Sequence, residues 1–148
     1  MAEIQRIVVH CTATPAGQEV TKNGLIKWFL SEPPFGLGWH HLGYHYLVKL
    51  DGTIEQLQPL NLDGWIDDTE IANGAKGFNS TSIHVAYAGG LKADKVTPAD
   101  TRTPAQKKAL RKLIAELKKA YHVTEVVGHR DLPGVKKTCP CFDVATQL

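Results

Sequence analysis

The chain has 148 residues, of which 43% are hydrophobic and 22% charged, and its formal net charge is +2. This length suits one domain with one hydrophobic core, so we expect a single domain over residues 1–148. The composition is typical of a soluble globular protein, and so small a net charge argues against nucleic acid as a partner. No run is apolar and long enough to predict a membrane-spanning helix.

The cysteines and the N-terminus bear on the compartment. Cys11, Cys139 and Cys141 are odd in number, and the first residues do not form a signal peptide. We therefore expect synthesis in the cytoplasm, where thiols stay reduced, and no disulfide framework. We also expect a monomer that does not insert into membranes.

Three elements are predicted in the first half of the chain. Alternating apolar and polar residues over 3–11 predict a strand that ends near His10, beside a small polar loop. The apolar spacing over 21–32 predicts a short helix that ends before two prolines. Two β-rich runs joined at Asp51 and Gly52 predict a hairpin, because glycine accepts the positive φ that such turns need.

The second half begins with an irregular segment. Residues 61–80 lack periodicity and predict a long loop with one short helical turn. The mostly apolar run "SIHVAYAGG" (82–90) predicts a strand in the centre of the sheet. A long helix over 103–122 and a last strand over 124–128 follow. The order β, α, β, β, loop, β, α, β predicts an α/β (mixed α+β) fold, with one mixed sheet of about five strands flanked by helices.

The helix over 103–122 has the clearest pattern. Thr103 and Gln106 have the spacing of a capping box, and Pro104 fits the first turn. Apolar residues recur on one face, and we interpret the lysines and Arg111 on the other face as a solvated surface. The residues predicted on the apolar face are Leu110, Leu113, Ile114, Leu117 and Tyr121.

The closing stretch "GHRDLPGVKKTCPCFDV" (128–144) crowds reactive side chains around two prolines. A metal site, a disulfide, a kinase-like catalytic loop or a polar tail would each account for it. The kinase motif needs an asparagine five positions after Asp131, where this chain has Lys136. A disulfide between Cys139 and Cys141 would close a very tight ring.

The metal site has more support. His10 and His129 each lie where a predicted strand gives way to a loop, and neighbouring strands can bring such ends together. Cys139 follows His129 by ten residues and can return along the same edge. Catalytic zinc typically takes three protein ligands of these kinds. The spacing alone is not specific, because surface or core histidines are an alternative. The other histidines are His40, His41, His45, His84 and His122.

Five pieces of the chain resemble, in order and approximate spacing, the type 2 N-acetylmuramoyl-L-alanine amidases. They are "IVVHCTATP", "LGYHYLVKLDGTIEQ", "AKGFNSTSIHVAYAGG", "TPAQKKALRKLI" and "GHRDLPGVKKTCPCFDV", between Ile7 and Asp143. This family includes amidase lysozymes of phages and animal peptidoglycan-recognition proteins. The resemblance implies the fold expected above and zinc-dependent hydrolysis of the bond between N-acetylmuramic acid and L-alanine in peptidoglycan. A compact domain for which we predict no signal peptide and no added wall-binding module favours a phage or prophage endolysin that acts on the cell wall after release.

The resemblance also implies roles for individual residues. His10, His129 and Cys139 would bind Zn²⁺, while Tyr44 and Lys137 would be catalytic. Zinc would lower the pKa of a water to roughly 7 and polarise the carbonyl. Lys137 would stabilise the oxyanion, and Tyr44 would orient the water or assist proton transfer to the leaving nitrogen.

The cysteines leave an alternative open. Cys141 could replace Cys139 as the ligand, because residues two apart in an extended segment lie on the same side. Cys11 directly follows His10 and should face the opposite side of its strand, in the core.

Other residues have simpler explanations too. Tyr44 could merely pack, and Lys137 could be solvated. Trp65 and Lys76 are expected to contact substrate, Trp65 by stacking on sugar or peptide, although burial as a loop anchor is an alternative. Several phage relatives carry a histidine where this chain has Gly74, a departure that affects the substrate side of the groove.

Other functions also fit the chain. A non-catalytic peptidoglycan-binding module of this fold characteristically lacks the cysteine ligand, which is present here as Cys139. A cytosolic amidase that recycles wall fragments would look similar. A regulatory role with a protein partner occurs among phage members, but no residue here supports it.

Overall fold

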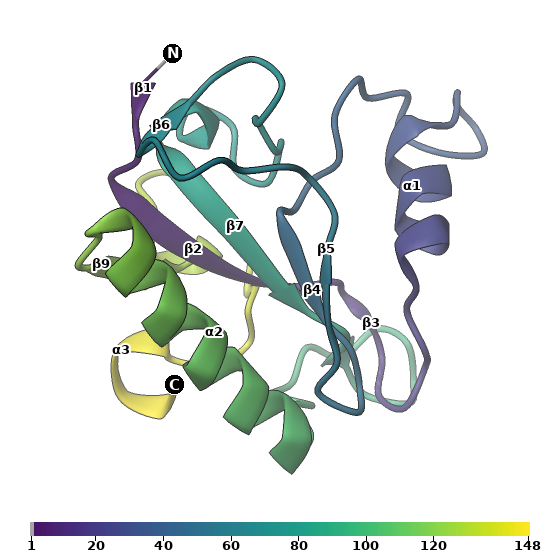
Figure 1. Ribbon diagram of the computed structural model, residues 1–148. Helices are drawn as coiled ribbons and strands as arrows, with labels where there is room; N and C mark the ends of the chain where they lie inside the picture. Colours follow the sequence, from purple (N-terminus) through teal and green to yellow (C-terminus); the bar gives the residue numbers. More distant parts are fainter. Residues whose placement is uncertain (1) are drawn as a thin grey trace.

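A five-stranded mixed sheet forms the centre of the computed structural model, which describes residues 2–148 (Figure 1). In spatial order its strands are β5 (Ile54–Gln56), β4 (Tyr46–Val48), β7 (Ser82–Tyr87), β2 (Arg6–Cys11) and β9 (Glu125–Gly128). β2 pairs in parallel with β7 and β9, and β7 pairs in parallel with β4, while the hairpin of β4 and β5 is antiparallel. The predicted mixed sheet and the central place of the "SIHVAYAGG" strand are therefore confirmed.

Helices cover both faces of this sheet. α2 (Pro104–Tyr121) crosses the front face in Figure 1, whereas α1 (Lys22–Leu30) stands apart from it, at the right. Phe29 of α1 and Leu47 of β4 belong to one core cluster. Val48, the next residue of β4, belongs to the other core cluster, beneath α2. Adjacent residues of a strand point to opposite faces, so α1 and α2 lie on opposite sides. The short α3 (Val144–Gln147) packs beside β9.

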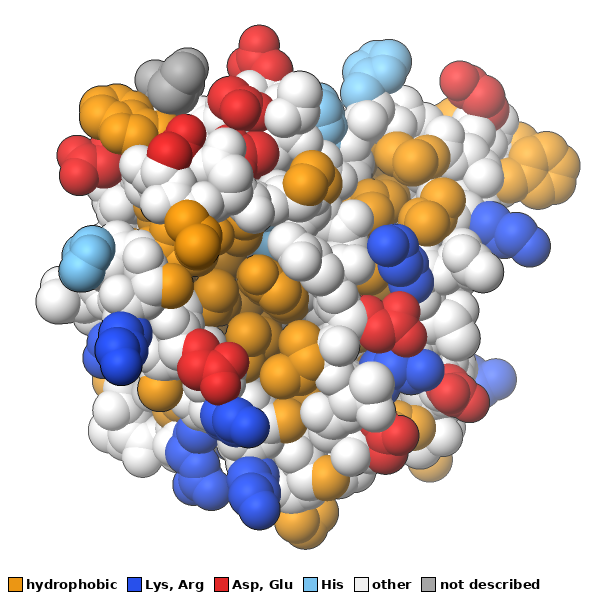
Figure 2. All heavy atoms as spheres, viewed as in Figure 1, with side chains coloured by type: hydrophobic (Ala, Val, Ile, Leu, Met, Phe, Trp, Pro, Cys, Tyr) orange, Lys and Arg blue, Asp and Glu red, His pale blue; other side chains and the backbone are white. Residues whose placement is uncertain are grey.

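The capping box predicted for α2 is confirmed. The Gln106 backbone N–H donates to the Thr103 hydroxyl at 3.0 Å, and Gln106 Oε1 accepts from the Thr103 backbone N–H at 2.9 Å. Gln106 also donates from Nε2 to Val48 O and Ala88 O, which fastens the start of the helix to the sheet. The predicted apolar stripe is buried, and Lys and Arg side chains gather over α2 in Figure 2.

Loops contain short strands that the pattern did not predict. β6 (Trp65–Ile66) lies inside the expected irregular loop and pairs with β1 (Ala2–Glu3). β3 (Thr14–Pro15) pairs with β8 (Gly90–Leu91). Two residues are too few to show a period, so these strands leave no sequence signal. The predicted helical turn is the 3-10 turn η1 (Asn79–Thr81).

Side chains of β2 alternate between the two faces of the sheet. Val9 and Cys11 belong to the core beneath α2, whereas Val8 packs with Leu132 on the other face. His10 has the same parity as Val8, so its side chain lies on the face away from α2. Within residues 2–148, none of the helices combines the length and hydrophobicity needed to cross a bilayer.

Candidate metal centre and groove

Three potential metal ligands from the two ends of the chain meet on this face. The ligand atoms of His10, His129 and Cys139 all lie within 4.8 Å of one another. His10 stands near the end of β2, and His129 directly follows β9, which pairs with β2 in parallel. The two rings are 4.7 Å apart between centroids, and His10 Nδ1 is 3.8 Å from Cys139 Sγ. The structure thus brings together the three residues chosen from the sequence.

The chemistry of this donor set fits zinc. Imidazole nitrogen and thiolate sulfur are ligands that zinc prefers, and three protein donors leave a fourth position for water or substrate. Both histidines are buried and Cys139 is half-buried, and all three line one cavity.

Protonation of the donors favours the same conclusion. Burial and the nearby charges of His129 and Lys137 hold the pKa of His10 well below its ordinary value. Burial and Lys137 also lower the pKa of His129. Hydrogen bonding from Cys11 lowers the pKa of the Cys139 thiol. Neutral imidazoles and a thiolate are the forms that bind metal.

The loop that carries Cys139 is held by hydrogen bonds. The Cys11 backbone N–H donates to Cys139 Sγ at 3.2 Å, and the Arg130 N–H donates to Cys139 O at 2.8 Å. Tyr87 OH donates to Pro140 O at 2.6 Å. The contact from Cys11 is one that sequence reasoning missed, because backbone donors carry no residue-type signal.

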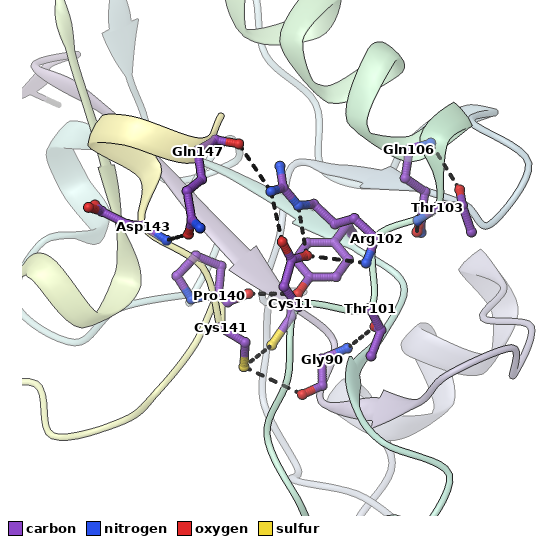
Figure 3. A network of polar contacts seen from close by, with 12 residues as sticks. Cys11, Gly90, Thr101, Arg102, Thr103, Gln106, Pro140, Cys141, Asp143 and Gln147 are labelled. Carbon is purple, nitrogen blue, oxygen red and sulfur yellow. Dashed lines mark hydrogen bonds and ion pairs between the residues drawn. The ribbon is translucent and has the colours of Figure 1, made fainter.

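Arg102 anchors the segment that follows Cys139 (Figure 3). Its guanidinium lies 3.4 Å from the centroid of the Phe142 ring and donates to Gln147 O at 3.1 Å. Asp100 accepts from Arg102 Nε at 2.9 Å, so the buried charge is paired. The C-terminal segment therefore has a fixed path behind the candidate metal ligands.

The expectation that Cys141 lies on the same side as Cys139 is wrong. Cys141 has a positive φ of 69°, and its N–H donates to Thr138 O at 2.7 Å, so the chain turns between the two cysteines. Cys141 Sγ instead donates to Gly90 O at 3.4 Å and lies 3.9 Å from Cys11 Sγ (Figure 3). Burial raises the pKa of Cys141 to about 11. Cys11 lies in the core as predicted.

A cavity of about 230 Å³ opens onto the three donors, and Tyr44 and Lys137 both line it. The Tyr44 ring centroid is 5.3 Å from that of His10, and Tyr44 OH donates to Cys11 O at 3.3 Å. Burial raises the pKa of Tyr44, which keeps its hydroxyl protonated. Lys137 is exposed at the rim.

Aromatic side chains that the sequence did not assign to a site form one wall of this cavity. Trp28 and Trp39 line it together with Phe29, and Trp39 stacks on Phe29 at 5.3 Å between centroids. Trp28 is 51% exposed although it lies on an amphipathic helix, next to the buried Phe29. Trp28 follows Leu25 by three residues, within the apolar spacing that predicted the helix, so the pattern gave no signal that it lines a site.

The two expected substrate residues occupy different places. Lys76 lines a second hollow of about 520 Å³, which shares residues with the first, among them His129 and Lys137. Trp65 lies on β6, paired with Glu3 before the start of β2, and neither hollow includes it. The structure therefore brings Lys76 to the groove and leaves Trp65 apart from it.

Volume alone does not identify the candidate metal centre among the hollows of the structure. A larger hollow of about 720 Å³ lies between the end of α2 and Leu148. Within the part of the chain that the structure describes, only the His10, His129 and Cys139 cluster could hold a metal.

Gly74 has a neighbour that explains the departure from the phage pattern. A Cβ atom on Gly74 would lie 2.6 Å from His84 Nδ1 and 2.7 Å from Gly43 O, which is closer than real Cβ contacts. A side chain at position 74 is therefore incompatible with the observed place of the His84 ring.

Acid is expected to destabilise the metal-free protein. Burial is the first cause that lowers the pKa of four histidines on this face, His10, His45, His84 and His129. Below pH 6.5, the ordinary histidine pKa, the unfolded chain then binds more protons than the folded one. The free energy of unfolding should therefore be highest above that pH and fall as the pH drops towards each folded-state pKa.

The expected loss of unfolding free energy is large. For His45, whose pKa falls to about 4, it amounts to about 3 kcal/mol over this interval. Denaturant titrations from about pH 7 to about pH 4 would measure it. His45→Asn keeps an acceptor for the His84 backbone N–H but cannot titrate, so it should reduce the pH dependence. An unfolding free energy that does not change with pH would contradict the expectation.

Fold and donor set together define an α/β protein with a candidate catalytic metal centre. A family model described as N-acetylmuramoyl-L-alanine amidase matches residues 1–142. The chain belongs to this family, and the resemblance seen in its motifs is confirmed.

Phage proteins are among its relatives. The endolysin of Klebsiella phage KP32 is 36% identical over 142 residues, which cover 96% of this chain and 83% of the relative. The endolysin of Escherichia phage T7 is 33% identical over 138 residues, with coverages of 93% and 81%.

Solved structures agree with the fold. The Ph2119 endolysin from a bacteriophage of Thermus scotoductus MAT2119 is 30% identical, with a TM-score of 0.67, and the match covers 95% of this chain and 79% of that one. Drosophila PGRP-LB is 19% identical, with a TM-score of 0.68 and coverages of 95% and 76%, and it supports the fold alone.

Proposed function

We propose that this protein is a zinc-dependent amidase that hydrolyses the bond between N-acetylmuramic acid and L-alanine in peptidoglycan. The observation that carries the proposal is the meeting of His10, His129 and Cys139 at a cavity that Tyr44 and Lys137 also line. Family membership supports amide hydrolysis, and the endolysin relatives support peptidoglycan as the substrate. We assign this activity to a single catalytic domain over residues 1–148.

The residues around the cavity divide the work of amide hydrolysis. A zinc ion held by the three donors would supply Lewis acidity, lowering the pKa of a water and polarising the scissile carbonyl. The Lys137 ammonium would stabilise the negative charge that develops on the carbonyl oxygen. The Tyr44 hydroxyl keeps its proton, so it can orient the attacking water or donate a hydrogen bond to the leaving nitrogen.

The groove provides surfaces for the rest of the substrate. Trp28 and Trp39 present aromatic faces beside the donors, and such faces stack on sugar rings and apolar peptide groups. Lys76, in the adjoining hollow, carries a positive charge that suits a carboxylate of the stem peptide. The glycan would then lie along the aromatic wall, with the peptide towards Lys76.

The first test follows the product. Purified sacculi treated with the protein are expected to release new L-alanine amino termini, because the cleaved amide joins alanine to the lactyl group. A strong chelator should stop the release, and added zinc should restore it. Unchanged amino termini would refute the proposal. Zinc-dependent binding to sacculi without cleavage would favour a non-catalytic module.

Endolysin and recycling functions differ in substrate. An endolysin that reaches the wall after release from the producing cell must cut intact sacculi, and the phage relatives favour this role. A recycling enzyme should prefer soluble muropeptides. Rates on the two substrates, measured side by side, would separate these roles.

A further inference from the structure

His84 is a wholly buried histidine of β7 that the proposed mechanism does not use. It pairs in register with Val8 of β2, so its side chain lies on the same face as that of His10. His84 Nδ1 is 2.8 Å from His10 Nε2, and the ring centroids are 4.9 Å apart. A hydrogen bond therefore joins His84 to the nitrogen of His10 that points away from Cys139.

Asn79 determines the direction of this hydrogen bond. The Ala75 backbone N–H donates to Asn79 Oδ1 at 2.8 Å. Because a backbone N–H can only donate, the Asn79 atom is the amide oxygen and can only accept. His84 Nε2 lies 3.0 Å from the same oxygen, so His84 Nε2 carries a hydrogen.

The burial of His84 determines which of the other ring nitrogens carry hydrogen. Among the described residues, its ring has no carboxylate partner, and a buried imidazolium without a counter-charge is costly. A neutral ring with hydrogen on Nε2 has a free lone pair on Nδ1, which accepts from His10 Nε2–H. His10 then presents its own lone pair on Nδ1, the atom 3.8 Å from Cys139 Sγ.

We propose that His84 is a positioning residue which, with Asn79 behind it, holds His10 in the tautomer that presents Nδ1 to the metal. The inference rests on the metal site of the proposed function. Metal-binding histidines usually donate their second N–H to a carboxylate, a carbonyl or a water. In this chain a neutral imidazole accepts that hydrogen, and an amide oxygen fixes the imidazole in turn.

The surroundings of His84 hold its ring in one place. His45 Nδ1 accepts the His84 backbone N–H at 2.9 Å, and the two rings stack at 4° with centroids 5.9 Å apart. His45 Nε2 donates to Glu70 O at 2.7 Å, which fixes the His45 tautomer. Gly74 leaves open the space that the His84 ring needs. The absence of a side chain at position 74 therefore lets His84 take its place behind His10.

A matched pair of substitutions tests the role of the acceptor. His84→Asn keeps an oxygen near the place of Nδ1, whereas His84→Leu has a similar size and no acceptor. His84→Leu should raise the zinc dissociation constant about 10- to 100-fold, and His84→Asn should recover most of this loss. Competition with a chromophoric chelator measures both constants. Equal affinity in the wild type and in folded His84→Leu would overturn the proposal.

A second measurement needs no metal, and its decisive result comes from the wild type. Nitrogen-15 NMR of the histidine rings in the metal-free wild type reads which nitrogen of His10 carries hydrogen. We expect hydrogen on Nε2, and on both nitrogens in a mixture for His84→Leu. Hydrogen on Nδ1 in the wild type would overturn the proposal even if His84→Leu does not fold. A wild type that shows Nε2–H but binds no zinc would support the positioning by His84 and refute the proposed function.

Discussion

Replacing Cys139 with serine is expected to remove bound zinc and to lower the amidase rate at least about 1,000-fold. A serine hydroxyl does not ionise near neutral pH, so only His10 and His129 would remain as ligands. Zinc content by atomic absorption and amide cleavage in sacculi measure the two effects. Full activity with normal zinc in Cys139→Ser would refute the proposed ligand set.

Cys141→Ser is the matched control for this substitution. Its thiol faces Gly90 O and Cys11, and a serine hydroxyl can donate to the same carbonyl. Zinc content and activity should therefore stay at the wild-type level. Loss of zinc in Cys141→Ser with retention in Cys139→Ser would reverse the assignment of the two cysteines.

Lys137→Met is expected to lower kcat about 10²- to 10³-fold, the usual effect of removing one oxyanion-stabilising group. Methionine keeps much of the length of the side chain and removes its charge. Zinc content should not change, because Lys137 is not among the three donors. Steady-state rates on a soluble muropeptide would separate an effect on kcat from one on KM.

Lys136→Met controls for the general loss of a positive charge beside the groove. Its neighbour Lys137 lines the cavity at the donors, whereas Lys136 lines only the adjoining hollow. A similar loss of kcat in both variants would point to the overall field of the groove and not to contact between Lys137 and the substrate.

Patterns within single elements predicted most of the fold. α2 repeats its apolar residues over many turns and carries its own cap, so local sequence determines where it begins. Asp51 and Gly52 mark the hairpin in the same way, and Gly52 has the expected positive φ. The strand β6 escaped prediction because it holds two residues, and only its pairing with β1 across the fold defines it.

The sequence predicted some residues of the candidate site and missed others. Motifs resembling the amidase family named the three ligands with Tyr44 and Lys137, and the structure brings all five together. Spacing in an extended segment left Cys141 open as an alternative ligand, but the chain turns there with a positive φ, and the Cys141 thiol donates to Gly90 O instead. Trp28 and Trp39 were missed as parts of the site, since exposure on a groove wall depends on how α1 packs.

His84 illustrates what the sequence determines and what the tertiary structure determines. The sequence by itself determined the strand that contains His84, the ligand types and the family, because these follow from residues close together or from motifs in order. Only the tertiary structure showed that two more of the seven histidines, His84 and His45, lie behind the candidate ligand His10. The hydrogen bonds from Ala75 through Asn79 and His84 to His10 join the loop before β7 to β7 and β2. The last of them joins residues 74 positions apart, so no pattern within a single element can record it.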